Sequence, residues 1–299
     1  MENSINNEVS MYFYELFTHN YARCLEINEV TKTAPFICDG FADEETYTSL
    51  EGPKVLFIGK EPHGFTEGKS PIICEQSDFE NFEDWAYKPF YQNLMFYYYA
   101  IKRSLLLDQD NQNDFRFTFE SNLIENSKKV EDQKKLFREL AFINIKKWDT
   151  NDSSSNDCVI WQYAKAYKDP LREQIKAIDP DIIFLCGTDI AFREIFEEKE
   201  INLEKDDDQD FNNLSYLDDK NKWFYFVKFN NKTQLVINYY HPSLRAKIAG
   251  WIHLLAVQNI LRNAITYMEA HEGDEGFKDL LKRLTKPKYT VSDSKDKRI

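Results

Sequence analysis

The chain has 299 residues, of which 42% are hydrophobic and 15% aromatic. So many large apolar side chains can fill a substantial core, which excludes a disordered or fibrous protein. The formal net charge of −13 argues against binding nucleic acid over the whole surface, because phosphate contacts need Lys and Arg on the docking face.

Hydrophobic patterning in the first half of the chain predicts helices and two buried strands. Lys54 to Gly59 is a short apolar run that ends in glycine, and 141–145 is a second run of this kind. Continuous apolar runs are typical of strands that are covered on both faces. The segment that leads up to Pro53 is predicted to be loop. Apolar residues recur at helical spacing over 8–25, 87–107 and 131–140.

The second half predicts helices over 159–178, 188–198 and 247–270, and strands over 181–187, 223–229 and 234–240. Side-chain oxygens of Thr188 and Asp189 are expected to cap the second of these helices. The last two strands flank a four-residue connection, 230–233, and so predict a hairpin whose second arm delivers His241.

This alternation predicts a three-layer α/β/α fold with a short, mostly parallel central sheet. We expect a single domain over 1–271, with its core at about 54–265 and a helical N-terminal extension over 1–53. The Lys-rich residues 272–299 are interpreted as a basic, flexible tail.

The five cysteines are scattered along the chain and form no C-x-x-C pair and no Cys/His cluster with zinc spacing. We therefore expect reduced thiols, a cytoplasmic location and no bound metal. No run of about 18 apolar residues occurs, and the first residues do not resemble a signal peptide. We expect no association with membranes.

Polar residues follow the predicted strands, and in parallel sheets ligands bind at the carboxyl ends of the strands. The first group is a hexapeptide in which a carboxylate and an imidazole lie between turn-forming residues, Gly59-Lys60-Glu61-Pro62-His63-Gly64. A carboxylate at this place can orient water or stabilise a positively charged transition state. The hexapeptide is equally compatible with an ordinary turn that carries exposed polar residues.

Two further groups lie at strand ends. His241 follows directly on an apolar strand, and its imidazole can donate a hydrogen bond to developing negative charge or carry a proton. Asn144 offers a donor and an acceptor on one planar amide, which suits the edge of a nucleobase. Taken singly, each of these residues is also compatible with a purely structural role.

The order of these segments resembles the uracil-DNA glycosylase superfamily. In that family the first motif follows strand one as Gly, a variable residue, an acid or Asn, then Pro, and the second motif is His-Pro-Ser after the last strand. Between the two motifs lie a strand that ends in Asn and a segment Pro-x-Ile-Ile-x-x-x-Gly. Residues 142–144 and 180–187 match these elements.

The resemblance implies a DNA glycosylase of base excision repair. Such an enzyme extrudes a nucleotide from single- or double-stranded DNA and hydrolyses the bond between uracil, or another damaged or modified base, and its deoxyribose. It implies that Glu61 positions water or stabilises the sugar cation, that Asn144 bonds the base, and that His241 stabilises the departing base anion. The best-known branch has Asp at Glu61 and Tyr at His63, so the resemblance does not fix which base is removed.

The resemblance also implies the surrounding contacts. The remaining substrate-binding residues are Gly59, Lys60, Pro62, His63 and Ser243. Leu244 and Arg245 lie where the family has a loop that enters the minor groove and touches phosphate, and Lys247 extends this nucleic-acid contact. We expect a monomer without a cofactor, since the chain lacks the close N-terminal cysteine pair of the branch that holds an iron–sulfur cluster.

Two alternatives to an active glycosylase fit the sequence to different degrees. The first is a non-catalytic protein of the same family that recognises a nucleotide, a nucleic acid or a protein partner; the acidic composition and the altered first motif favour it. The second, an α/β hydrolase with a serine nucleophile, is disfavoured because no G-x-S-x-G sequence occurs.

Overall fold

The computed structural model describes residues 39–62, 89–106, 134–148, 155–196, 200–202, 223–243 and 250–285. Its strands are β1 (Gly40–Phe41), β2 (Val55–Gly59), β3 (Ala141–Asn144), β4 (Ile182–Cys186), β5 (Ile201–Asn202), β6 (Phe224–Phe229) and β7 (Lys232–Tyr239). They form one sheet in the order β1-β3-β2-β4-β7-β6-β5. The helix predicted over 8–25 lies outside the described residues.

The centre of the sheet is parallel, and its edges are antiparallel. β3, β2, β4 and β7 run in the same direction, whereas β1 pairs antiparallel with β3, and β6 with both β7 and β5. The strands predicted in the first half and the later hairpin are therefore confirmed. The hairpin turn is tighter than predicted: only Asn230 and Asn231 lie between the strands, with φ of 53° and 59°, a left-handed backbone that asparagine tolerates.

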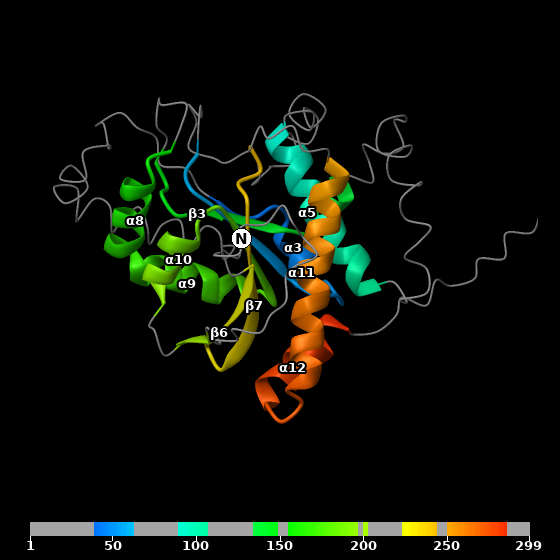
Figure 1. The fold of residues 1–299 in the computed structure, drawn as a ribbon. Coiled ribbons are helices and arrows are strands. Elements are labelled where there is room, and N and C mark those ends of the chain that lie inside the picture. Colours follow the sequence, from blue (N-terminus) through cyan, green and yellow to red (C-terminus); the bar gives the residue numbers. More distant parts are fainter. Residues whose placement is uncertain are drawn as a thin grey trace, which may run out of the picture.

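Helices cover both faces of the sheet (Figure 1). One face carries α5 (Pro89–Leu106), α11 (Gly250–Ala270) and α12 (Glu275–Leu284), and the other carries α3 (Glu44–Thr48), α8 (Asp157–Ala166), α9 (Lys168–Ile178) and α10 (Asp189–Ile195). Alternate residues of β2 supply the two cores, with Val55 and Phe57 on the first face and Leu56 and Ile58 on the second. An α/β fold with a mixed sheet that is mostly parallel at its centre is thus confirmed.

The helix predicted over 159–178 is two helices. α8 ends before Tyr167, whose backbone leaves the helical region with ψ of 29°, and α9 starts at Lys168. Pro170 explains the break, because proline has no amide to donate to Ala166 but fits the first turn of a new helix. The two helices pack over Trp148 through the rings of Tyr163 and Tyr167.

Two segments hold structure where the sequence predicted loop or tail. Before Pro53 the chain forms β1 and α3, which the carboxylate of Asp43 caps. Residues 275–284, predicted to be flexible tail, form α12, which buries Phe277, Leu280 and Leu284 at helical spacing. Charged residues fill most of the other positions of α12, so its composition concealed an amphipathic helix.

The prediction that the side chain of Thr188 caps α10 is wrong. The side chain of Thr188 makes no cap hydrogen bond, and its hydroxyl instead donates to the backbone oxygen of Ile58 at 3.0 Å. This bond joins β2 to the start of α10. Thr188 therefore fixes the carboxyl ends of two neighbouring strands relative to each other.

Candidate functional site

The residues that follow the four parallel strands lie along one edge of the sheet. Gly59 is paired in register with Asn144, and Cys186 with Tyr239. Lys60 and Glu61 therefore follow β2 between Asn144 on one side and the end of β4 on the other. His241 follows β7, one strand further along, so the sheet brings the predicted segments to a common edge.

Gly187 is the point at which the two motifs meet. Its φ of +69° is unfavourable for residues with a side chain. A Cβ atom there would lie 3.5 Å from Cβ of His241 and 3.7 Å from Cε of Lys60. Lys60 and His241 thus approach the same glycine from β2 and β7, the two strands that flank β4.

A pocket of about 570 Å³ opens beside these residues. Lys60, Gly187 and His241 are on its wall, together with Thr188, Asn238 and the aromatic residues Trp161, Trp223, Tyr239 and Tyr240. A mainly apolar cavity with a few polar groups, at the carboxyl ends of parallel strands, is the usual form of a small-molecule site in such sheets.

The ring of His241 has a defined orientation. The backbone amide of Ser243 donates to its Nδ1 at 3.2 Å. Because Nδ1 accepts, the proton of the neutral imidazole is on Nε2 and can be donated. Phe90 of α5 lies 5.7 Å from the imidazole, ring centre to ring centre. His241 can therefore act as a hydrogen-bond donor to negative charge in the pocket.

Glu61 is not among the residues that line this pocket. Its carboxylate is 1% exposed and contacts the ammonium of Lys146 at 2.8 Å, and the ammonium itself is fully buried. The same ammonium lies 5.6 Å from the ring centre of Tyr163. The two charges therefore compensate each other inside the protein, and the carboxylate is turned away from bulk water.

Asn144 is also buried, and a second ion pair holds its backbone. The amide nitrogen of Asn144 donates to Oδ2 of Asp39 at 2.7 Å, and Lys147 binds Oδ1 of the same carboxylate at 2.7 Å. Gln174 of α9 joins them, accepting from Lys147 and donating to Asp39. A Cβ on Gly59 would lie 2.6 Å from Oδ1 of Asn144, so this amide covers the end of β2 and only glycine fits beneath it.

The remaining predicted residues divide into two groups. Pro62 is buried and Ser243 is exposed, and the backbone oxygen of Pro242 accepts from Asn93 of α5 at 2.6 Å. His63, Leu244, Arg245 and Lys247 lie outside the described residues.

Sequence reasoning missed most of the pocket wall and both buried ion pairs. Trp161 and Asn238 gave no signal, because they lie inside elements rather than at strand ends. The adjacent lysines Lys146 and Lys147 did give one, since they lie just after the strand that ends at Asn144. Lysine is usually exposed to water, whereas here both side chains are buried and paired with acids that are distant in the sequence.

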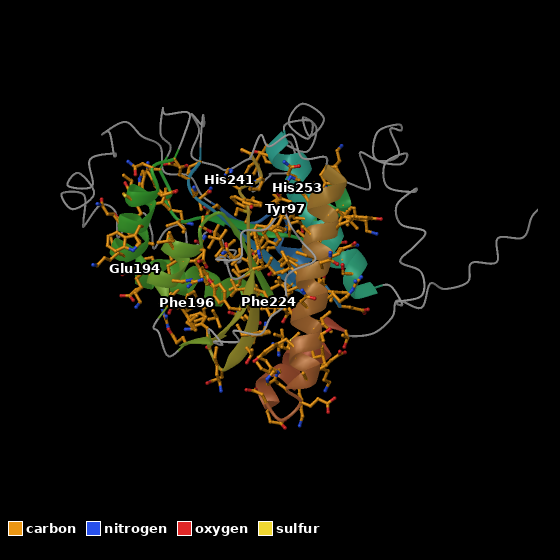
Figure 2. The ribbon with its side chains drawn as sticks, in the orientation of Figure 1. Tyr97, Glu194, Phe196, Phe224, His241 and His253 are labelled. Carbon is orange, nitrogen blue, oxygen red and sulfur yellow. The ribbon has the colours of Figure 1, made fainter. Side chains whose placement is uncertain are left out.

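A neutral hydrogen-bonded pair supports the pocket from behind. The hydroxyl of Tyr239 lies 3.0 Å from Nδ1 of His253 of α11. Burial raises the pKa of Tyr239 and lowers the pKa of His253. Tyr239 therefore stays protonated, and its hydroxyl donates a hydrogen bond to Nδ1 of the neutral imidazole. Figure 2 shows His253 next to Tyr97, between α5 and α11.

In the described part of the chain, no three His, Cys, Asp or Glu side chains gather in an arrangement that could hold a metal ion. Every helix within the described ranges is too short or too polar to traverse a lipid bilayer.

No protein-family model matches the chain. No curated protein matches its sequence either.

Proposed function

We propose that this protein is a DNA glycosylase that binds an extruded nucleobase beside His241 and hydrolyses its N-glycosidic bond. The observation that supports it most is the approach of Lys60 and His241 to Gly187 at the wall of one aromatic pocket. These residues belong to the two segments that resemble the motifs of the uracil-DNA glycosylase superfamily, and the finer fold assignment to that family is part of the proposal.

The reaction requires little from the protein besides binding and electrostatics. The bond between C1′ and the base breaks, and its electron pair leaves with the base. The oxygen of a water molecule bonds to C1′, and a water proton is released. Nε2–H of His241 stabilises the negative charge on the leaving base, in the manner of an oxyanion-hole donor. Asn238 offers an amide on the pocket wall that can bond the edge of the base, whereas the amide of Asn144 covers the end of β2.

The test is base release from oligonucleotides that carry uracil, hypoxanthine or hydroxymethyluracil, single-stranded and in duplex. The variant His241→Ala is expected to release base about 10²- to 10³-fold more slowly, because one hydrogen-bond donor to the developing negative charge is lost. Asn238→Ala should also lower the rate of release, because the pocket wall loses an amide. The matched control is His271→Ala, which changes an exposed histidine beyond α11 and should leave the rate unchanged. Equal rates for all three variants would contradict the proposal.

A second candidate is supported by the burial of Glu61. A carboxylate that is 1% exposed and neutralised by Lys146 is poorly placed to activate water, although catalytic contacts often form only when substrate binds. A protein with this arrangement can bind a nucleobase or nucleotide without cleaving it. Binding of deoxyuridine monophosphate, with no product from any oligonucleotide over hours, would favour this function over the first.

The double variant Glu61→Met/Lys146→Met decides the role of Glu61. It removes both charges together and so avoids leaving one of them buried and unpaired. If Glu61 is catalytic, this variant folds and binds the oligonucleotide but releases base much more slowly than the wild type. Unchanged release by the folded variant would assign Glu61 and Lys146 a structural role.

A further inference from the structure

The outer wall of the pocket lies on α8 and α10 and has no part in the proposed chemistry. Beside Asp157 and Asp189, this wall consists of Cys158, Ile160, Trp161, Ile190 and Ala191. Ile190 is 74% exposed, and in the described ranges the one other exposed large hydrophobic residue, Leu255, is 40% exposed. The binding of a ligand would explain why an apolar side chain is exposed to solvent at the rim of a pocket.

Trp161 is held rigidly in this wall. Its indole nitrogen donates to the carboxylate of Glu194 of α10 at 3.0 Å. The ammonium of Lys165 lies 5.2 Å from the centre of the ring, where cation and ring attract each other. A fixed aromatic ring loses little conformational entropy when a ligand stacks on it.

The charges of the wall indicate what kind of group it accepts. Lys60 is paired with Asp157 at 2.6 Å, and Arg193 with Asp189 at 2.9 Å. These two cations are thus engaged with carboxylates, and Asp157 is itself 75% exposed. Phosphate binding needs cations directed at the ligand, so an uncharged planar group suits this wall better than a phosphate.

We propose that the wall is a stacking subsite for the base next to the extruded nucleotide, and that the substrate is single-stranded DNA. This inference rests on the proposed function. The wall is continuous with His241 in one cavity, so a neighbouring base is the group that reaches it. In a duplex that neighbour is paired and stacked within the helix, whereas in a single strand it is free to stack on Trp161.

The test measures the affinity of three probes. The first is a single-stranded oligonucleotide with one deoxyuridine that carries a 2′-fluorine, which disfavours the sugar cation and keeps the base attached. The second is the same strand in duplex, and the third is deoxyuridine monophosphate, which has no neighbour. We expect Trp161→Leu to weaken single-strand binding by roughly 5- to 150-fold and to leave mononucleotide binding unchanged. Trp161→Phe, which keeps a ring, should lose less.

Ile190→Ala provides a variant with little risk of unfolding, because the side chain is exposed. Single-strand binding should weaken by roughly 3- to 10-fold. Leu255→Ala is the matched control, since Leu255 is 40% exposed on α11, across the sheet from α10 (Figure 1), and it should change nothing.

The outcomes distinguish a failure of the subsite from a failure of the proposed function. If the wild type binds the single strand and all variants bind it equally, the subsite is wrong and the proposed function stands. If the variants weaken the mononucleotide as much as the oligonucleotide, Trp161 belongs to the base pocket and the neighbour subsite is overturned. A wild type that binds none of the probes overturns both proposals.

Discussion

The two ends of the sheet's carboxyl edge are built in opposite ways. At the ends of β3 and β2, Lys146 and Lys147 neutralise Glu61 and Asp39 inside the protein, and the space is filled. At the ends of β4 and β7, the edge opens into a pocket of about 570 Å³ with His241 on its wall. The same edge is therefore closed by charges at one end and hollow at the other.

This difference indicates that one end of the edge provides rigidity and the other provides a binding site. Buried ion pairs stabilise a structure little compared with apolar residues of equal volume, but they are costly to break on one side only. The closed end thus fixes strand ends in a defined geometry. At the open end, two hydrogen bonds between neutral groups, Tyr239 to His253 and Thr188 to the backbone of Ile58, hold the strand ends, and space is left for a ligand.

Breaking one ion pair of the closed end should have the largest effect on stability. Lys146→Met leaves the carboxylate of Glu61 buried without its partner, and we expect the free energy of unfolding to fall by about 3–5 kcal/mol. The double variant Glu61→Met/Lys146→Met should recover most of this loss. Urea unfolding of the wild type, both single variants and the double variant measures it. Additive losses in the double variant would show that the two charges do not depend on each other.

A glycine at each end gives a smaller and more specific contrast. At Gly59 an added Cβ would lie 2.6 Å from both Oδ1 of Asn144 and Cζ of Phe142, so Gly59→Ala is expected to cost about 1–3 kcal/mol through overpacking. At Gly187 the surrounding atoms lie at ordinary distances, and Gly187→Ala should cost about 1–2 kcal/mol through its left-handed backbone.

The two glycine variants should respond differently to a second change. Asn144→Ala removes one of the two clashes at Gly59 and should recover part of the loss there. His241→Ala should recover nothing at Gly187, because the strain is in the backbone. Thermal unfolding of the single and double variants measures both. If His241→Ala recovers stability in the Gly187→Ala variant, the loss caused by Gly187→Ala is steric.

The sequence was most informative where a single element decides the outcome. Runs such as 182–186 are apolar throughout because both faces of the strand are covered, and the positions of the central strands follow from this pattern. The proximity of Lys60 to His241 was also predictable, because parallel strands bring their carboxyl ends to one edge. Both predictions needed only local patterning and the topology of parallel sheets.

The sequence was least informative where distant residues compensate one another. Lys147 is buried only because Asp39 and Gln174, from other elements, bind its ammonium, and no local pattern encodes that partnership. The same holds for Glu61, whose carboxylate was predicted in the site but is bound to Lys146. The wall residue Trp161 was hidden for a related reason, since its position in the pocket depends on how α8 packs against α10.

The open end should be the more sensitive of the two to mild acid through His253. Burial lowers the pKa of this imidazole in the folded protein, so the unfolded chain binds a proton more readily, and stability falls as the pH drops below about 6.5. Protonation also forces Nδ1 to give up the hydrogen bond that it accepts from Tyr239. His253→Gln, which cannot titrate, should flatten the dependence of the free energy of unfolding between pH 7 and 5.5. His271→Gln, at an exposed position, is the control and should retain the slope. An unchanged slope in the His253 variant would mean that another group causes the acid sensitivity, and that the neutral pair behind the pocket tolerates a proton.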